Sequence, residues 1–237
     1  MPATLALLLL NGVVFVAQLV VALRRSPSWE AILLGGTSVD VVRFGAMPLG
    51  SLPLALHEPW RALSAMFVHI GVVHLALNMS ALFYLGRMAE PAIGAARFVL
   101  VYLLTGLGGF LASLVYSVLA GQHALTAGAS GALFGLTGLV LGILLRRRDP
   151  RWKAWATQAV LFGLMFGFAV KVANNSAHLG GVAIGLGCGL VLGRDAPRPA
   201  ARWQNVLAAL GLAASVASLV AAQLSPLWRL LEDVLTQ

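Results

Sequence analysis

Seven apolar runs, most of them about 20 residues long, follow one another along the chain, and the segments between them hold most of its charges. A helix needs about 20 apolar residues to cross the hydrocarbon core of a bilayer. Within that core, few structures other than a helix satisfy all of their backbone hydrogen bonds. The pattern therefore predicts an all-α polytopic membrane protein. The predicted spans are residues 3–23, 69–88, 92–119, 130–145, 154–172, 176–193 and 206–224.

Composition excludes a soluble domain of this size. Of the 237 residues, 59% are hydrophobic and only 10% are charged, whereas soluble domains carry about 25% charged residues. The formal charge of +8 could suggest a nucleic-acid partner, but the basic residues lie between the apolar runs and not in patches with aromatic residues. They are typical of membrane-topology signals, and no nucleic acid is expected.

The distribution of basic residues also predicts an orientation. With the N-terminus in the cytoplasm, the inner segments hold ten of the sixteen lysine and arginine residues. The positive-inside rule favours this orientation, although Arg24 and Arg25 lie on the opposite side. The same two residues follow the first apolar run, and no positive charge precedes it. We therefore expect a retained transmembrane helix and not a signal peptide.

The spans divide the chain into five predicted parts. The segment between the first two spans contains apolar pieces and is expected to lie in the membrane interface. Its Trp60-Arg61 pair is typical of a headgroup anchor or of an aromatic belt. The parts are a first transmembrane helix (1–23), a long interfacial first loop (24–68), core helices two to six (69–193), a linker with a seventh helix (194–224) and an amphipathic tail (225–237).

A serine between two glycines begins the fourth span, in the run Gly128-Ala129-Ser130-Gly131. A serine at a helix start is commonly an N-cap, and the alternative is a nucleophile. His178 begins the sixth span on the same side, and ionisable groups inside a membrane are costly and usually functional. Because no acidic residue lies inside a predicted span near them, a Ser-His dyad is a simpler hypothesis than a triad.

Glycines follow both residues at helical spacing. Small residues four apart allow two membrane helices to approach closely. If the two glycine stripes meet, Ser130 and His178 lie together at a similar depth in the membrane. The stripes are Gly131, Gly135, Gly138 and Gly142 in the fourth span, and Gly181, Gly185, Gly189 and Gly193 in the sixth.

His74 and Asn78 are four residues apart and share one face of the second span. They either form hydrogen bonds to another helix or donate to a developing oxyanion, a task for which asparagine is well suited. The cysteine, histidine and acidic residues do not cluster at metal-binding spacings. No metal and no cofactor is expected.

Several of these motifs, in order over about residues 40–193, resemble the rhomboid family of intramembrane serine proteases. The seventh span resembles the six-plus-one form of that family, which implies a bundle of six core helices and one C-terminal helix. Many members carry a tyrosine four residues after the serine, where this chain has Phe134. The motifs are Trp60-Arg61, Phe67-Val68-His69 with His74 and Asn78, Tyr84-Leu85-Gly86 with Glu90, Gly128-Ala129-Ser130-Gly131, and Ala177-His178 with Gly181 and Gly185.

The resemblance implies a serine endopeptidase that hydrolyses peptide bonds in or near transmembrane segments of single-pass membrane proteins. It implies Ser130 as the nucleophile and His178 as the general base. His74, Asn78 and the backbone N–H of Ser130 would form the oxyanion hole. The implied location is the bacterial inner (plasma) membrane, with the site towards the outer face. Structural residues near the site would be His69, Gly128, Gly131, Phe134, Gly181 and Gly185.

Two other functions stay open. A catalytically inactive relative that binds membrane clients would share this fold, although the presence of Ser130, His178 and Asn78 together favours an enzyme. A transporter would place polar groups at the bilayer midplane beside broken helices. In this chain the polar residues gather at helix starts on one side.

Overall fold

The computed structural model describes residues 1–25, 27–49, 52–122, 124–169, 174–193 and 199–236. Within these residues the regular secondary structure is helical apart from one short two-stranded sheet. The predicted all-α polytopic architecture is confirmed. The seven long helices are α1 (Pro2–Arg25), α6 (Val72–Ile93), α7 (Ala95–Ala120), α8 (Ser130–Arg146), α9 (Trp152–Ala169), α10 (Asn175–Leu192) and α11 (Arg202–Leu224).

Each predicted span overlaps one of these helices, and residues 170–172, at the end of the fifth predicted span, lie outside the described residues. The seven helices differ in length and polarity. Within the described ranges, five of them, α1, α6, α7, α10 and α11, are long and apolar enough to cross a bilayer. Helix α8 has 17 residues, which at 1.5 Å per residue is about 25 Å. Helix α9 includes Lys153 and Gln158. Five of the seven predicted spans therefore meet this criterion of length and polarity, and α8 is a shorter apolar helix.

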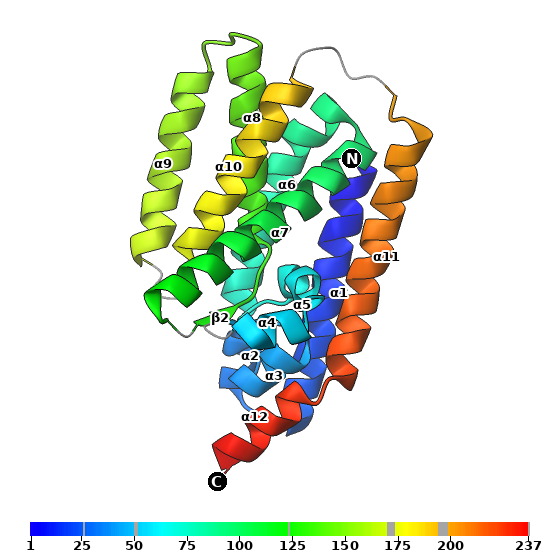
Figure 1. Ribbon diagram of the computed structural model, residues 1–237, viewed down its shortest axis with the longest axis vertical. Helices are drawn as coiled ribbons and strands as arrows, with labels where there is room; N and C mark the ends of the chain where they lie inside the picture. The colour runs from blue at the N-terminus through cyan, green and yellow to red at the C-terminus, as the bar shows by residue number, and fades with distance from the viewer. Residues whose placement is uncertain (26, 50–51, 123, 170–173, 194–198, 237) are drawn as a thin grey trace.

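The long helices form a bundle with two distinct edges (Figure 1). Helix α9 lies at one edge, beside α8, and α11 lies at the other edge, where it contacts α7. The short elements between α1 and α6 gather at one end of the bundle, together with the C-terminus. The N-terminus lies towards the opposite end. This arrangement brings the starts of α8 and α10 to the end where the short elements lie.

Helices α8 and α10 pack with their backbones almost in contact. A Cβ atom added to Gly185 would lie 1.8 Å from the carbonyl oxygen of Gly135, and one added to Gly181 would lie 2.1 Å from that of Gly131. Real Cβ atoms do not come within 3.0 Å of such atoms. The two glycine stripes therefore meet, and this part of the sequence prediction is confirmed.

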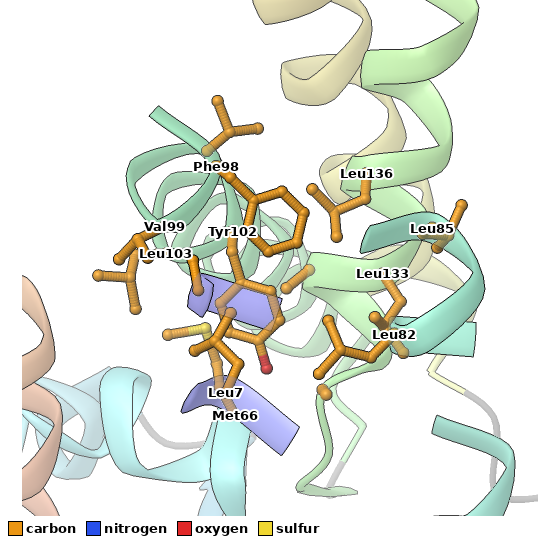
Figure 2. Close-up of a cluster of buried hydrophobic side chains, with 14 of the residues drawn as sticks. Leu7, Met66, Leu82, Leu85, Phe98, Val99, Tyr102, Leu103, Leu133 and Leu136 are labelled. Carbon is orange, nitrogen blue, oxygen red and sulfur yellow. The ribbon is translucent and has the colours of Figure 1, made fainter. Parts of the chain in front are cut away.

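The interior of the bundle is built around α7. Figure 2 shows the rings of Phe98 and Tyr102 from α7 lying among leucines of α6 and α8. Both rings are fully buried, as are Leu82 of α6 and Leu136 of α8. These buried side chains pack closely against one another, and such packing is the main attraction between helices in a membrane.

A carboxylate joins α6 to α1. Glu90, in the last turn of α6, accepts hydrogen bonds from the backbone N–H of Ala3 (3.1 Å), the backbone N–H of Thr4 (2.8 Å) and the Thr4 hydroxyl (2.6 Å). The first N–H groups of a helix have no partner within it, and they favour a negative charge. Glu90 therefore caps α1 and holds its start beside the end of α6.

The segment between α1 and α6 is folded and is not a plain loop. Its strand β1 (Met47–Leu49) pairs antiparallel with β2 (Ala124–Thr126), which ends four residues before Ser130. The first loop is thereby attached to the segment that leads into α8. Its other elements are α2 (Trp29–Leu34), α3 (Ser38–Arg43), α4 (Leu52–His57), α5 (Arg61–Ser64) and the 3₁₀ helix η1 (Ala65–Phe67).

Arg61 is buried within this folded segment and has no exposed surface. It forms an ion pair with Glu58 and donates to the carbonyl oxygen of Val42 (2.6 Å) and to Ser225 Oγ (3.1 Å). The prediction that Arg61 is a headgroup anchor is wrong, because a side chain without exposed surface does not reach lipid headgroups. Its charge instead holds the first loop to the end of α11.

Within the predicted amphipathic tail, residues 227–236 form the helix α12 (Leu227–Thr236). Helix α12 lies against α3, where the Arg43 guanidinium carbon is 4.6 Å from the centre of the Trp228 ring. The side chain of Gln223 accepts from Arg43 Nε and donates to the Arg43 carbonyl oxygen, both at 3.1 Å. The C-terminal segment therefore packs against the folded segment between α1 and α6.

The near contact of α8 and α10 predicts a difference between two glycines of α10. Gly185→Ala places a methyl group against a backbone carbonyl, so the helices must separate, and we expect a loss of about 1–3 kcal/mol. Gly187→Ala is the matched control, since a Cβ atom there meets nothing within 4 Å. Thermal unfolding of the purified variants in detergent should show a lower midpoint for Gly185→Ala alone. Equal midpoints would contradict the packing described.

Candidate active site

The structure places the two predicted site residues of α8 and α10 in contact. Ser130 Oγ lies 3.0 Å from His178 Nε2. Each residue lies in the first turn of its helix, and the glycine contacts described above fix how close the helices come. A hydroxyl and an imidazole at this distance can exchange a proton.

Ser130 is not an idle helix cap. The N-cap position of α8 belongs to Ala129, which has no side-chain cap, and Ser130 is the first residue of the helix. Its hydroxyl interacts with His178 instead of with the backbone of its own helix. The N-cap alternative for Ser130 is therefore wrong. The backbone N–H groups of a first helical turn have no partner within the helix, so the Ser130 N–H is placed to donate outward.

An aromatic ring orients His178. The rings of Phe134 and His178 stack with centres 4.1 Å apart and an angle of 18° between their planes. Phe134 also contacts Phe162 of α9, with ring centres 6.0 Å apart. The contact between the imidazole and a ring four residues after the serine is present with phenylalanine, and a phenolic hydroxyl is not needed for it.

His74 and Asn78 lie on one face of α6 and line the same cavity as Ser130. Asn78 Nδ2 donates to the carbonyl oxygen of His74 at 2.8 Å. A primary amide carries a second N–H for another acceptor. The backbone N–H of Ile70 donates to His74 Nδ1 at 3.2 Å. Each side chain is thus held by a backbone group four residues before it.

Gly128 allows His74 to approach the loop before Ser130. Its φ of +115° lies in a region that side-chain-bearing residues rarely adopt. A Cβ atom at this position would lie 2.7 Å from His74 Cε1 and 2.9 Å from His74 Nε2. The Gly128 N–H donates to the carbonyl oxygen of Ala65 at 2.8 Å. Gly128 is therefore required both by its backbone conformation and by the imidazole beside it.

His69 precedes α6 and has no exposed surface. Its ring centre lies 5.2 Å from that of His74. Burial is the main reason that the pKa of His69 falls to about 3, and the neighbouring His74 lowers it further. His69 therefore stays neutral at physiological pH and packs beside His74 without placing a charge there.

The site opens into a cavity of about 300 Å³. Its lining is mostly apolar, with Leu77, Ala81 and Leu85 from α6 and Leu133 and Phe134 from α8. The polar lining residues are His74, Asn78, Thr126, Ser130, Thr137, Asn174 and His178. Among the described lining residues none is acidic, and the described residues contain no group of three or more potential metal ligands.

Residues 56–195 match the Rhomboid domain family. The chain belongs to the rhomboid family. This rhomboid protein is 38% identical to Rhomboid protease GluP of Bacillus subtilis over 184 residues, which is 76% of this chain and 34% of that protein. It is 35% identical to RHOMBOID-like protein 1 of Arabidopsis thaliana over 173 residues, which is 70% of this chain and 42% of that protein.

A fungal relative, Rhomboid-type serine protease 2 of Emericella nidulans, is 34% identical over 143 residues, which is 58% of this chain and 28% of that protein. The matches thus cover less than half the length of each of these curated relatives. Family membership and the apolar helices together make this rhomboid protein an integral multi-pass membrane protein.

Sequence reasoning missed Asn174, the N-cap of α10. Its Oδ1 accepts from the backbone N–H of Ala177 (3.1 Å), and its Nδ2 donates to Thr126 Oγ1 (3.0 Å) and to Ser113 Oγ. Asn174 therefore joins the strand before Ser130 to the helix start that carries His178. The preference for asparagine at helix N-caps could have indicated the role of Asn174 from the sequence.

Two substitutions of Asn174 should separate its role as the N-cap of α10 from its hydrogen bonds to Thr126 and Ser113. Asn174→Ala loses the cap and the bridge, and loss of a cap costs about 0.5–2 kcal/mol. Asn174→Asp keeps an acceptor for the Ala177 N–H and loses the donors to Thr126 and Ser113. We expect the thermal midpoint in detergent to fall for Asn174→Ala and to be partly restored by aspartate. An alanine variant as stable as the parent protein would show that the cap is unimportant.

Proposed function

We propose that this rhomboid protein is an intramembrane serine endopeptidase that uses Ser130 and His178 as a catalytic dyad. The observation that carries the proposal is the 3.0 Å contact of Ser130 Oγ with His178 Nε2 at the wall of a cavity. Two of the relatives described above are named as proteases.

In the proposed reaction, His178 takes the hydroxyl proton while Ser130 Oγ attacks the scissile carbonyl carbon. The tetrahedral intermediate collapses when His178 passes that proton to the leaving amine, and the C–N bond breaks. Water then enters, gives a proton to His178 and attacks the acyl-enzyme ester. The second tetrahedral intermediate collapses as its bond to Ser130 Oγ breaks. His178 returns the proton to that oxygen, and the new carboxyl terminus is released. No carboxylate is needed to balance these steps.

We propose that His74, Asn78 and the Ser130 backbone N–H form the oxyanion hole. All three residues line one cavity, and each supplies an N–H donor without a negative charge nearby among the lining residues. Preorganised donors in a site of low polarity contribute more than they do in water. His69, Phe134 and the glycines Gly128, Gly131, Gly181 and Gly185 hold these groups in place.

The cavity favours substrates of a particular kind. Its walls are apolar and its polar groups gather around Ser130 and His178. A transmembrane segment supplies apolar side chains for such walls. It must also unwind locally, because a helix shields its own carbonyl groups. We therefore propose that the substrates are single-pass membrane proteins cleaved in or near their transmembrane segments.

The proposed location is the bacterial inner (plasma) membrane, with the N-terminus in the cytoplasm and the site towards the outer face. The support is the distribution of the basic residues, of which ten in sixteen fall on the inner side in this orientation. Labelling of single cysteines introduced near Arg148 and near Trp29, in intact cells, measures which side each segment occupies.

A fluorophosphonate that labels activated serines tests the dyad without knowledge of the natural substrate. We expect labelling of the parent protein and none of Ser130→Ala or His178→Ala, with a folded protein in each case. Ser215→Ala is the control, because the Ser215 hydroxyl donates only to the Gly211 carbonyl of its own helix. Labelling or cleavage that persists in Ser130→Ala would refute the proposal. A parent protein that is never labelled would favour an inactive, client-binding relative.

Removal of Asn78 should affect turnover more than binding. Loss of one oxyanion donor lowers kcat by about 10²–10³ in other serine proteases, so we expect Asn78→Ala to reduce kcat strongly and to leave KM nearly unchanged. The measurement is steady-state cleavage of a single-pass substrate in detergent. An increase in KM at unchanged kcat would instead make Asn78 a residue of substrate binding.

A further inference from the structure

Helix α1 buries three polar side chains, Thr4, Asn11 and Gln18, at a spacing of seven residues, and none of them has exposed surface. Thr4 binds Glu90, and Asn11 Nδ2 donates to the Leu7 carbonyl of its own helix. Gln18 differs, because its amide binds the backbone of the segment between α1 and α6. Polar groups inside a membrane protein are costly unless paired, so the partners of Gln18 are informative.

The amide nitrogen of Gln18 donates to two backbone carbonyl oxygens, that of Gly35 at 2.7 Å and that of His69 at 2.9 Å. These carbonyls belong to segments 34 residues apart. The two segments also lie in close contact, because a Cβ atom added to Gly71 would lie 2.0 Å from the carbonyl oxygen of Leu33. Gln18 therefore holds the residues before α6 against the end of α2.

The segment that Gln18 holds is the one that contacts His74. The backbone N–H of Ile70, which follows His69, donates to His74 Nδ1 at 3.2 Å. A backbone N–H can only donate, so Nδ1 must carry a lone pair. In the neutral imidazole the proton then lies on Nε2. His74 is thereby a donor from Nε2 and not from Nδ1.

The Nε2 side of His74 faces the loop that leads to the serine. The ideal Cβ position of Gly128, two residues before Ser130, lies 2.9 Å from Nε2 and 3.8 Å from Nδ1. An imidazole with its proton on Nδ1 would present a lone pair towards the loop and would repel an oxyanion. The donor role proposed for His74 therefore depends on the tautomer that the Ile70 N–H selects.

We propose that Gln18 is a positioning residue for the oxyanion hole, acting through His69, Ile70 and the tautomer of His74. The inference rests on the proposed function and extends it to α1, outside the residues 56–195 that match the family. If the amide is lost, two buried carbonyls lose their donor and the segment before α6 is released. The Ile70 N–H then no longer fixes the lone pair on Nδ1.

The first test reads the tautomer directly and needs no enzymatic activity. The full chain is labelled with ¹³C and ¹⁵N histidine in detergent micelles, and the ring signals of His74, one of five histidines, are assigned by their loss in His74→Ala. We expect the Nε2–H tautomer in the parent protein and a mixture in Gln18→Met, which keeps the length of the side chain without its donors. Asn11→Leu, on the same face of α1, is the control and should retain the Nε2–H form.

A parent protein whose His74 carries its proton on Nδ1 would overturn the inference, even if Gln18→Met does not fold. An unchanged tautomer in a folded Gln18→Met would overturn it too. Because these readouts do not depend on catalysis, they also decide the inference if no protease activity is found. The absence of serine labelling would then count only against the proposed function.

The second test is kinetic. A partly wrong tautomer is a milder loss than a missing donor, so we expect kcat to fall about tenfold in Gln18→Met, with little change in KM. The double variant Gln18→Met, His74→Ala should be no slower than His74→Ala alone, because the two residues act as a unit. Losses that multiply, or a parent-like kcat in Gln18→Met, would refute the coupling between them.

Discussion

The close approach of the α8 and α10 backbones is the constraint on which the rest of the site depends. Glycine carbonyls and glycine α-carbons occupy the space between the helices, and even one methyl group does not fit at Gly181 or Gly185. Because Ser130 and His178 lie in the first turns of these helices, the distance between them is set by backbone contact. Flexible side chains elsewhere in the bundle need not be placed as accurately for Ser130 and His178 to meet.

Around this rigid pair, the structure holds the neighbouring groups with hydrogen bonds to loops. The pairing of β1 with β2 and the Gly128–Ala65 bond anchor the residues before Ser130. Asn174 connects the same segment to the start of α10. The arrangement is typical of a polar site at one end of a bundle whose interior is otherwise apolar. A triad carboxylate has no counterpart among the described cavity residues, and ring stacking on Phe134 orients the imidazole instead.

The long helices, the glycine stripes and the meeting of Ser130 with His178 could be predicted, because hydropathy and helical spacing are local properties of a sequence. The folded first loop could not, since its short elements depend on distant partners. Arg61 illustrates this, because a Trp-Arg pair between apolar runs looks like an interfacial anchor until Ser225 and the carbonyl of Val42 are seen around it. Gln18 gave a weak signal through its spacing with Asn11 and Thr4, but its partners lie in other segments.

The hydrogen bond between Arg61 and Ser225 joins residues that are 164 positions apart. A ribosome therefore makes the arginine long before its hydroxyl partner, and most of the helices are already synthesised when Ser225 emerges. Until then the guanidinium has its nearer partners, which are Glu58, the carbonyls of Val42 and Ala46, and the Trp60 ring. The layer that anchors the strand before Ser130 is thus completed only after α8 and α10 have been synthesised. A nascent chain that has not yet reached Ser225 contains both Ser130 and His178 without this finished support.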